Sequence, residues 1–234
     1  GEYRGVPNWI GPPGCGIEDA RFVPIEAGRI QEGMDTWETF VHQEYPDRLV
    51  QLALLHAEFE ALHPFLDGNG RLGRMLVPLF LHQKGLLSRP VFYISAYLEQ
   101  RRDEYYQQLL MVSKLENWTS WCEFFLKAVI EQASINRAKA ADIVQLHREM
   151  ISRSAELTHS QFAPLAVDYL FRQPIFKTTS FIKASGIPEP SARRFLRLFK
   201  DAGIVITVKP AQGRKAASLA FPELLNLAEG YSVL

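Results

Sequence analysis

The sequence has few cysteines and no long apolar run. Its 234 residues include only two cysteines, Cys15 and Cys122, which lie far apart and form no Cys-x-x-Cys pair. This excludes a disulfide framework and a zinc knuckle, and it favours a reducing, cytoplasmic compartment. No stretch approaches 18 consecutive apolar residues, and the first residues lack the apolar centre of a signal peptide. We therefore predict a soluble chain without a membrane partner.

The sequence also lacks net charge. Its 26 Lys and Arg residues balance 26 Asp and Glu residues, so the whole chain has no overall attraction for nucleic acid or an anionic membrane. The two signs are nevertheless unevenly distributed. Residues 160–221 hold ten Lys/Arg and three Asp/Glu, a net charge of +7, whereas residues 1–159 hold 16 and 21, a net charge of −5. A basic C-terminal part therefore follows an acidic N-terminal part.

Helical periodicity covers much of the sequence. Apolar residues recur at helical spacing over residues 34–62, and further helices are predicted for 71–85, 100–115 and 119–154. Two short runs flank a loop rich in proline and glycine and predict a β-hairpin over 6–23. We divide the chain into a core (1–135), a connecting helix (136–158) and a C-terminal domain (159–234).

The C-terminal domain has the pattern of a winged helix. Three helices are predicted over 164–202 and two strands over 203–221, so the sequence ends in a helix–turn–helix followed by a hairpin. Arg193, Arg197 and Lys200 share one face of the last helix, while Arg214 and Lys215 fall in the wing. This basic surface favours DNA binding. Packing on the core, dimerisation and protein binding stay open as alternatives.

The residue types that can carry chemistry gather in residues 63–74, His-Pro-Phe-Leu-Asp-Gly-Asn-Gly-Arg-Leu-Gly-Arg. Gly68 and Gly70 allow backbone N–H groups to converge at the start of a helix, where the helix dipole favours an anion. Arg71 and Arg74 lie on the first turn of that helix and can bind further oxygen atoms.

Two more residues complete a candidate phosphate site. The Asp67 carboxylate can hold a divalent cation that bridges phosphates, and His63 can accept a proton near neutral pH. The sequence therefore predicts a nucleotide-phosphate site with a general base. His56 and Glu60 share a helical face with His63, but the HExxH pattern is absent. We predict that His56 packs in the core and that no zinc site forms.

This stretch resembles the motif of the Fic family, HxFx(D/E)GNGRxxR, at every defined position. The resemblance extends from about residue 5 to residue 154. It implies a mainly α fold, in which a Fic-type helical core carries a β-hairpin flap and is followed here by the small α+β winged-helix domain. It also implies a protein adenylyltransferase that uses ATP and Mg²⁺ to transfer AMP to a Ser, Thr or Tyr hydroxyl of a target protein.

The resemblance assigns roles within the motif. His63 is the general base, Asp67 binds Mg²⁺ between the α- and β-phosphates, and the Asn69 side chain fixes the α-phosphate. Arg74 contacts the γ-phosphate. The residues expected to contact the nucleotide are Phe65, Gly68, Asn69, Gly70, Arg71, Gly73 and Arg74.

Two further features resemble the family. Tyr105 and Tyr106 resemble an aromatic pair that lines the adenine pocket, although adjacent helical residues point about 100° apart, so at most one can face the base. The hairpin over 6–23 resembles a flap that holds the target segment by strand addition. The alternatives are packing of the tyrosines in the core and an ordinary edge hairpin.

Gly70 stands where the related Doc-like kinases have lysine, which favours adenylyl transfer over phosphorylation. The alternatives to adenylyl transfer are another phosphoryl or nucleotidyl transfer, or an inactive Fic core attached to a DNA-binding regulator. Self-modification and a homodimer stay open. The inhibitory motif [S/T]xxxE[G/N] of many members is not matched, since Gln100 follows Ser95–Glu99 and Leu157 follows Ser152–Glu156. We expect a fragment that lacks this inhibition.

Overall fold

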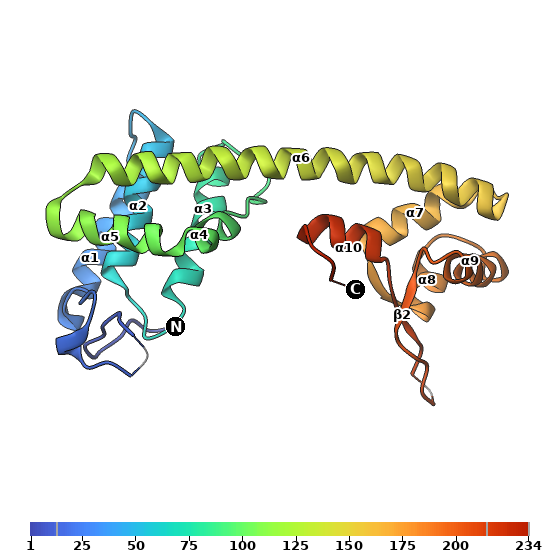
Figure 1. Cartoon of the computed structure of the whole chain (residues 1–234), viewed down its shortest axis with the longest axis horizontal. Helices are drawn as coiled ribbons and strands as arrows, with labels where there is room; N and C mark the ends of the chain where they lie inside the picture. The colour runs from blue at the N-terminus through green and yellow to red at the C-terminus, as the bar shows by residue number, and fades with distance from the viewer. Residues whose placement is uncertain (13, 214, 234) are drawn as a thin grey trace. The chain divides into compact units, whose positions relative to one another are not determined.

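The chain folds into two compact units, Gly1–Asn136 and Arg137–Leu234 (Figure 1). The computed structural model describes residues 1–12, 14–213 and 215–233. Helix α6 (Trp118–Thr158) begins in the first unit and continues into the second. Within the described ranges, no helix is long and apolar enough to cross a membrane.

The secondary-structure elements described in the first unit are helices. In chain order its elements are the 3₁₀ helices η1 (Ile17–Asp19) and η2 (Ala27–Arg29), then α1 (Ile30–His42), α2 (Arg48–Leu62), α3 (Asn69–Gln83), α4 (Ser95–Gln100), α5 (Arg102–Leu115) and the start of α6. Helix α2 packs against α1, α3 and α5, so most of its surface is buried. The motif begins at the C-terminal end of this central helix.

Two interactions hold α2 in place. The Asp47 carboxylate caps its start by accepting hydrogen bonds from the backbone N–H groups of Leu49 (2.8 Å) and Val50 (3.1 Å). The fully buried Trp121 of α6 donates its indole N–H to the Ala53 carbonyl at 2.8 Å. The end of α2 is therefore carried by a helix that is fixed at its start and in its middle.

The β-hairpin predicted over 6–23 does not form as a pair of strands. One antiparallel bridge joins Ile10 to Phe22, with N–H···O distances of 2.9 Å and 3.1 Å in the two directions. The 3₁₀ helix η1 lies between these residues. The prolines of this segment have no N–H to donate to a ladder, which limits its length. Pro13, predicted to be in the loop, lies outside the described residues.

The second unit combines helices with a small sheet. Its elements after α6 are α7 (Ala163–Arg172), β1 (Ile175–Lys177), α8 (Thr178–Ala184), α9 (Glu189–Asp201), β2 (Ile206–Lys209), β3 (Ser218–Ala220) and α10 (Pro222–Glu229). The sheet is antiparallel with the order β1-β3-β2. Ile175 pairs with Ala220, and Ile206 pairs with the same residue from the other side.

This arrangement contains the three helices and the hairpin that the sequence predicts, and it adds β1, which the sequence did not indicate. Phe181 of α8, Phe195 and Phe199 of α9 and Leu219 of β3 are fully buried in one core. The assignment of this unit to the winged-helix class stays a prediction. In the first unit, the helix predicted for 100–115 is α5, which begins at Arg102, and the short helix α4 before it was not predicted.

Candidate active site

The candidate base, His63, is the residue at which helix α2 ends. Its backbone is left-handed, with φ 46° and ψ 57°, and the following Pro64 disfavours a further helical turn. Burial lowers the pKa of the half-buried imidazole below its ordinary value of 6.5, while the Glu60 backbone carbonyl acts in the opposite direction. The ring is therefore neutral at pH 7, which is the form that can accept a proton.

Arg4, which the sequence analysis did not single out, holds the backbone at this point. Its guanidinium is buried and donates to the carbonyl oxygens of His63 (2.9 Å), Val6 (3.1 Å), Leu62 (3.5 Å) and Ile25. Two of these carbonyls belong to the last residues at the end of α2, where a positive charge is favourable. Arg4 is therefore a positioning residue for His63. No local pattern around Arg4 indicates this role.

The Asn69 side chain closes the motif loop on itself. Its Oδ1 accepts a hydrogen bond from the Phe65 backbone N–H at 2.9 Å, and its Nδ2 donates to the Phe65 carbonyl at 2.7 Å. Asn69 is buried, and the amide has used one donor and its acceptor on the loop. In this structure the amide shapes the loop. Contact between its remaining N–H and the α-phosphate stays a prediction.

The Phe65 ring also belongs to the interior. It lies 5.6 Å from the Tyr3 ring, centroid to centroid, and packs against a cluster that includes Ile30, Met34 and Phe59. The structure therefore gives this side chain a packing role, and its nucleotide contact stays a prediction.

The two glycines form a cradle at the start of α3. Gly68 has φ 85°, a left-handed conformation that favours glycine, and it precedes the first helical residue. The first N–H groups of α3, beginning at Asn69, have no intrahelical partner. A Cβ at Gly70 would lie 3.0 Å from Nη1 of Arg74, so the guanidinium reaches back over the glycine. The unpaired backbone N–H groups at the start of α3 and the Arg74 guanidinium therefore lie together where the sequence predicts an anion site.

Arg71 and Asp67 form an exposed pair beside this cradle. The Arg71 guanidinium lies 3.2 Å from the Asp67 carboxylate, whose other oxygen accepts the Gly68 N–H at 2.6 Å. Both side chains are open to solvent and can turn towards a ligand. No cluster of three or more His, Cys, Asp or Glu side chains that could hold a metal occurs among the described residues. One carboxylate together with phosphate oxygens is a normal set of Mg²⁺ ligands, so Asp67 fits this cation.

A buried carboxylate, Glu60, faces this region from α2. Burial raises the pKa of Glu60 to about 7. The positive charge of Arg74 and, to a smaller extent, a hydrogen bond from the Tyr105 hydroxyl act in the opposite direction. Its Oε1 has no hydrogen-bond partner among the described residues. A Cβ at Gly73 would lie only 2.5 Å from this oxygen. Gly73 therefore allows α3 to approach α2, and its nucleotide contact stays a prediction.

The two predicted adenine-pocket residues, Tyr105 and Tyr106, lie in different environments: one in the core and one at the surface. Tyr105 is buried, and its hydroxyl lies 2.9 Å from Nε2 of His56, a buried ring that stacks on Trp121. Burial lowers the pKa of His56 to about 4, so this histidine is neutral and packs in the core as predicted. Tyr106 is 41% exposed. The structure therefore makes Tyr105 a core residue and leaves only Tyr106 for contact with a base.

Tyr106 borders a cavity of about 1050 Å³ that lies between the N-terminal segment, α2 and α5. Its walls include Phe22, Glu60, Arg102, Tyr106, Leu110 and Trp118. This volume is in the range of small-molecule sites. Glu60 stands one turn before His63 on α2, so the cavity reaches the start of the motif.

Opposite effects are expected for the two tyrosines. Tyr105→Phe leaves the buried His56 nitrogen without its partner and should lower the free energy of unfolding by about 1–3 kcal/mol. Tyr106→Ala removes an exposed ring and should leave that free energy almost unchanged while weakening the binding of ATP. Chemical denaturation and a nucleotide titration of both variants measure this. Equal loss of ATP affinity in the two variants would contradict the assignment of Tyr105 to the core and Tyr106 to the cavity.

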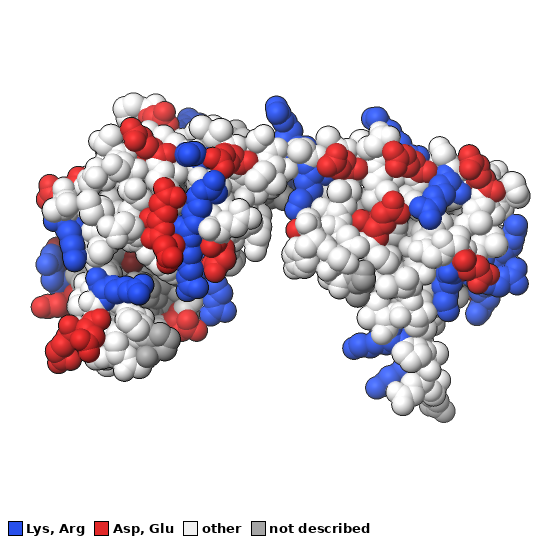
Figure 2. All heavy atoms as spheres, viewed as in Figure 1, with Lys and Arg blue, Asp and Glu red and all other residues white. Residues whose placement is uncertain are grey.

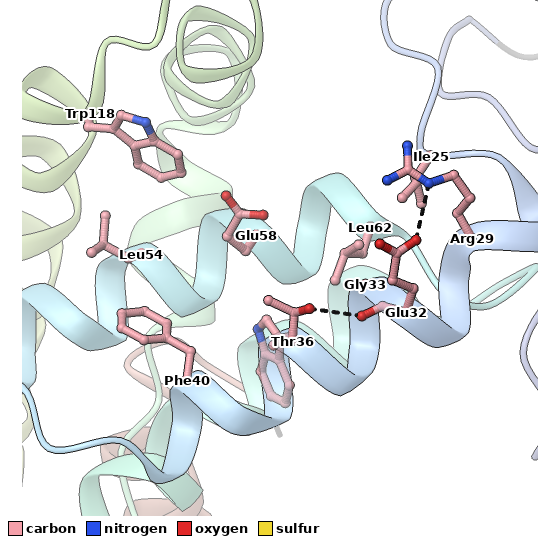
Figure 3. Close-up of a pocket in the computed structure, with 11 residues that line it drawn as sticks. Ile25, Arg29, Glu32, Gly33, Thr36, Phe40, Leu54, Glu58, Leu62 and Trp118 are labelled. Atoms are coloured by element: carbon pink, nitrogen blue, oxygen red, sulfur yellow. Dashed lines mark hydrogen bonds and ion pairs between the residues drawn. The ribbon is translucent and has the colours of Figure 1, made fainter.

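A second cavity, of about 590 Å³, opens between α1 and α2 (Figure 3). Phe40 and Leu54 give it apolar walls, and the ion pair between Arg29 and Glu32 (3.3 Å) lies at one end. Glu58 borders this cavity as well as the larger one, and burial raises its pKa. No motif residue lies among its described walls.

Comparisons with known proteins find similarity in the part of the chain that carries this site. Residues 1–81, which contain the whole motif, match the Fic/DOC family. The matched residues make up the N-terminal part of the chain. A probable protein adenylyltransferase of Aquifex aeolicus (strain VF5) is 37% identical over 62 residues, which are 26% of this chain and 19% of that relative.

The fold of the chain also has a solved counterpart. A Fic family protein from Desulfovibrio desulfuricans G20 superimposes with a TM-score of 0.51 and 22% identity, over 94% of this chain and 62% of that one. At this identity the likeness concerns the fold alone. The chain spans only 19% of the curated relative and less than two thirds of the structural neighbour.

Proposed function

We propose that this chain is a protein adenylyltransferase, which transfers AMP from ATP to a hydroxyl side chain of a target protein. The match to the Fic/DOC family and the name of the Aquifex relative support a transferase at the level of the family. The observation that carries the proposal for this chain is the geometry of residues 63–70. A neutral His63 and a cradle of free backbone N–H groups lie on one loop that Asn69 closes.

The phosphates of ATP occupy the cradle in this proposal. The N–H groups at the start of α3 face the α- and β-phosphates, and Arg71 and Arg74 turn from their present places towards the outer oxygens. Asp67 holds Mg²⁺, which neutralises charge on the phosphates when it is bound. The adenosine part extends into the 1050 Å³ cavity beside Tyr106.

The reaction is a substitution at the α-phosphorus. His63 takes the proton of the attacking hydroxyl, whose oxygen forms a bond to the α-phosphorus while the bond to the β-phosphate oxygen breaks and pyrophosphate leaves. Such chemistry depends on positioning and on neutralising charge more than on covalent help. The segment around the Ile10–Phe22 bridge, which borders the same cavity, is the proposed place for the target segment.

Gly70 favours transfer of the adenylyl group over the γ-phosphoryl group. Its missing Cβ leaves the space that the Arg74 guanidinium now covers, and a lysine there would crowd the cradle. The test is to incubate the chain and a cell extract with Mg²⁺ and ATP labelled in either the α- or the γ-phosphate. Relative to the same extract without the chain, we expect added protein-bound label from the α-position only. Added label from the γ-position would indicate a kinase, and added label from neither would overturn the proposal.

A further inference from the structure

Helix α9 presents a continuous basic face on the second unit. Its inward side is apolar, with Ala192, Phe195, Leu196 and Phe199 buried. Its outward side carries Arg193, Arg194, Arg197 and Lys200, all exposed. Helical spacing places these four cations within about one third of the circumference. Figure 2 shows blue side chains gathered over this helix and along the hairpin.

Most of this charge is not neutralised by neighbouring side chains. Arg193 is paired with Glu189, at 2.6 Å and 2.9 Å. For Arg194, Arg197 and Lys200, no ion pair occurs among the described residues. Three cations on one exposed face are therefore available to an external partner. A purely structural role for α9 accounts for its apolar side and a polar outer side, but not for the excess of positive charge on that outer side.

The hairpin after α9 adds cations. Lys209 at the end of β2 and Lys215 in the turn are exposed, and a bridge between Gln212 and Lys215 (N–H···O distances of 3.1 Å and 2.9 Å) closes the turn. Arg214, predicted in the wing, lies outside the described residues. The excess of +7 over residues 160–221 is thus concentrated on one helix and the hairpin after it.

We propose that α9 and this hairpin bind double-stranded DNA, independently of the transfer reaction. An α-helix with its side chains is about 10–12 Å across, which matches the major groove of B-form DNA, about 12 Å wide. Arg194, in the N-terminal half of α9, reaches base edges, while Arg197, Lys200 and the hairpin lysines contact phosphates. Duplex RNA is the poorer partner because its major groove is too deep and narrow for a helix.

The test uses the full chain and a fluorescent mixed-sequence duplex about three helical turns long. Binding is measured by anisotropy at several salt concentrations between about 50 and 200 mM. The variant Arg197→Ala/Lys200→Ala removes two phosphate contacts from the basic face. Its matched control is Arg137→Ala/Arg148→Ala, which removes the same charge from exposed positions of α6. All four side chains are exposed, so both variants should keep the melting temperature.

We expect the unaltered chain to bind with a Kd of about 10⁻⁶–10⁻⁴ M near physiological salt. The α9 variant should bind at least about tenfold more weakly, with a salt dependence shallower by about two units of slope, and the control should be nearly unchanged. His63→Asn should bind DNA as the unaltered chain does. Absence of duplex binding at about 50 mM salt, equal losses in both double variants, or equally tight binding of duplex RNA would each overturn the proposal.

Discussion

Replacing His63 by asparagine is expected to reduce AMP transfer by about 10²–10⁴-fold, the usual contribution of a general base. The imidazole is the group on this loop that is neutral at pH 7 and able to accept a proton, because burial lowers its pKa. Binding of ATP should change little, since the N–H groups at the start of α3 and the two motif arginines are untouched. The initial rate of AMP incorporation and an ATP titration measure the two quantities.

Asparagine is chosen because it can keep the left-handed backbone conformation of His63. His63 has φ 46°, and asparagine adopts this left-handed conformation more easily than alanine does. His63→Ala would therefore combine loss of the base with strain at the end of α2. We expect both variants to lose transfer and only the alanine variant to lose stability. Undiminished transfer in His63→Asn would show that another group accepts the proton.

The pH profile gives a second measure of the same base. Since burial lowers the pKa of His63 below 6.5, the neutral form dominates at pH 7. The transfer rate should therefore decrease on acidification with a midpoint below pH 6.5. A midpoint above pH 6.5 would contradict the effect of burial on this ring.

Replacing Arg74 by alanine is expected to lower kcat/KM for ATP by about 10²-fold or more, the typical cost of removing one donor that stabilises transition-state charge. It should also raise the pKa of Glu60 above its present value of about 7, because the Arg74 charge lowers that pKa. Kinetics at saturating target and NMR titration of the Glu60 carboxyl measure the two effects. The buried carboxylate thus reports on the arginine without any substrate.

Arg74→Lys separates these effects. A lysine keeps the positive charge near Glu60 but loses the planar, two-pronged contact with phosphate. We expect the pKa of Glu60 to return towards about 7 in this variant, whereas kcat/KM stays well below that of the unaltered chain. Full recovery of kcat/KM in Arg74→Lys would mean that charge alone explains the role of Arg74. Unchanged kinetics in Arg74→Ala would remove it from the site.

Local signals predicted much of the fold. The end of α2 before Pro64, the glycine turn and the start of α3 depend on residue types that act on neighbouring backbone, so the sequence was sufficient there. The prediction of a β-hairpin over 6–23 was wrong because strand pairing there does not depend on local signals alone. Its alternation of apolar runs and prolines fits a hairpin, but pairing depends on contacts with the rest of the unit, and only the Ile10–Phe22 bridge forms.

The roles of individual residues in and near the motif were harder to predict. Asn69, Gly73 and Tyr105 all lie in or near the site, yet each faces the interior: one closes the loop, one allows two helices to approach, and one pairs with His56. A motif gives the order of residues along the chain but not the direction in which each side chain points. Glu60 could have been found from the sequence, since a carboxylate among apolar residues of a buried helix is unusual.

The ring that the Asn69 amide closes with the Phe65 peptide group has a consequence for the motif itself. The two residues are four positions apart, and both hydrogen bonds require that separation. One inserted or deleted residue between them would break the ring, whatever its type. The donors of the cradle are already oriented before a nucleotide arrives, so binding needs little ordering of the protein. The length of this loop is therefore under a tighter constraint than the identity of Leu66 within it, whose side chain is exposed.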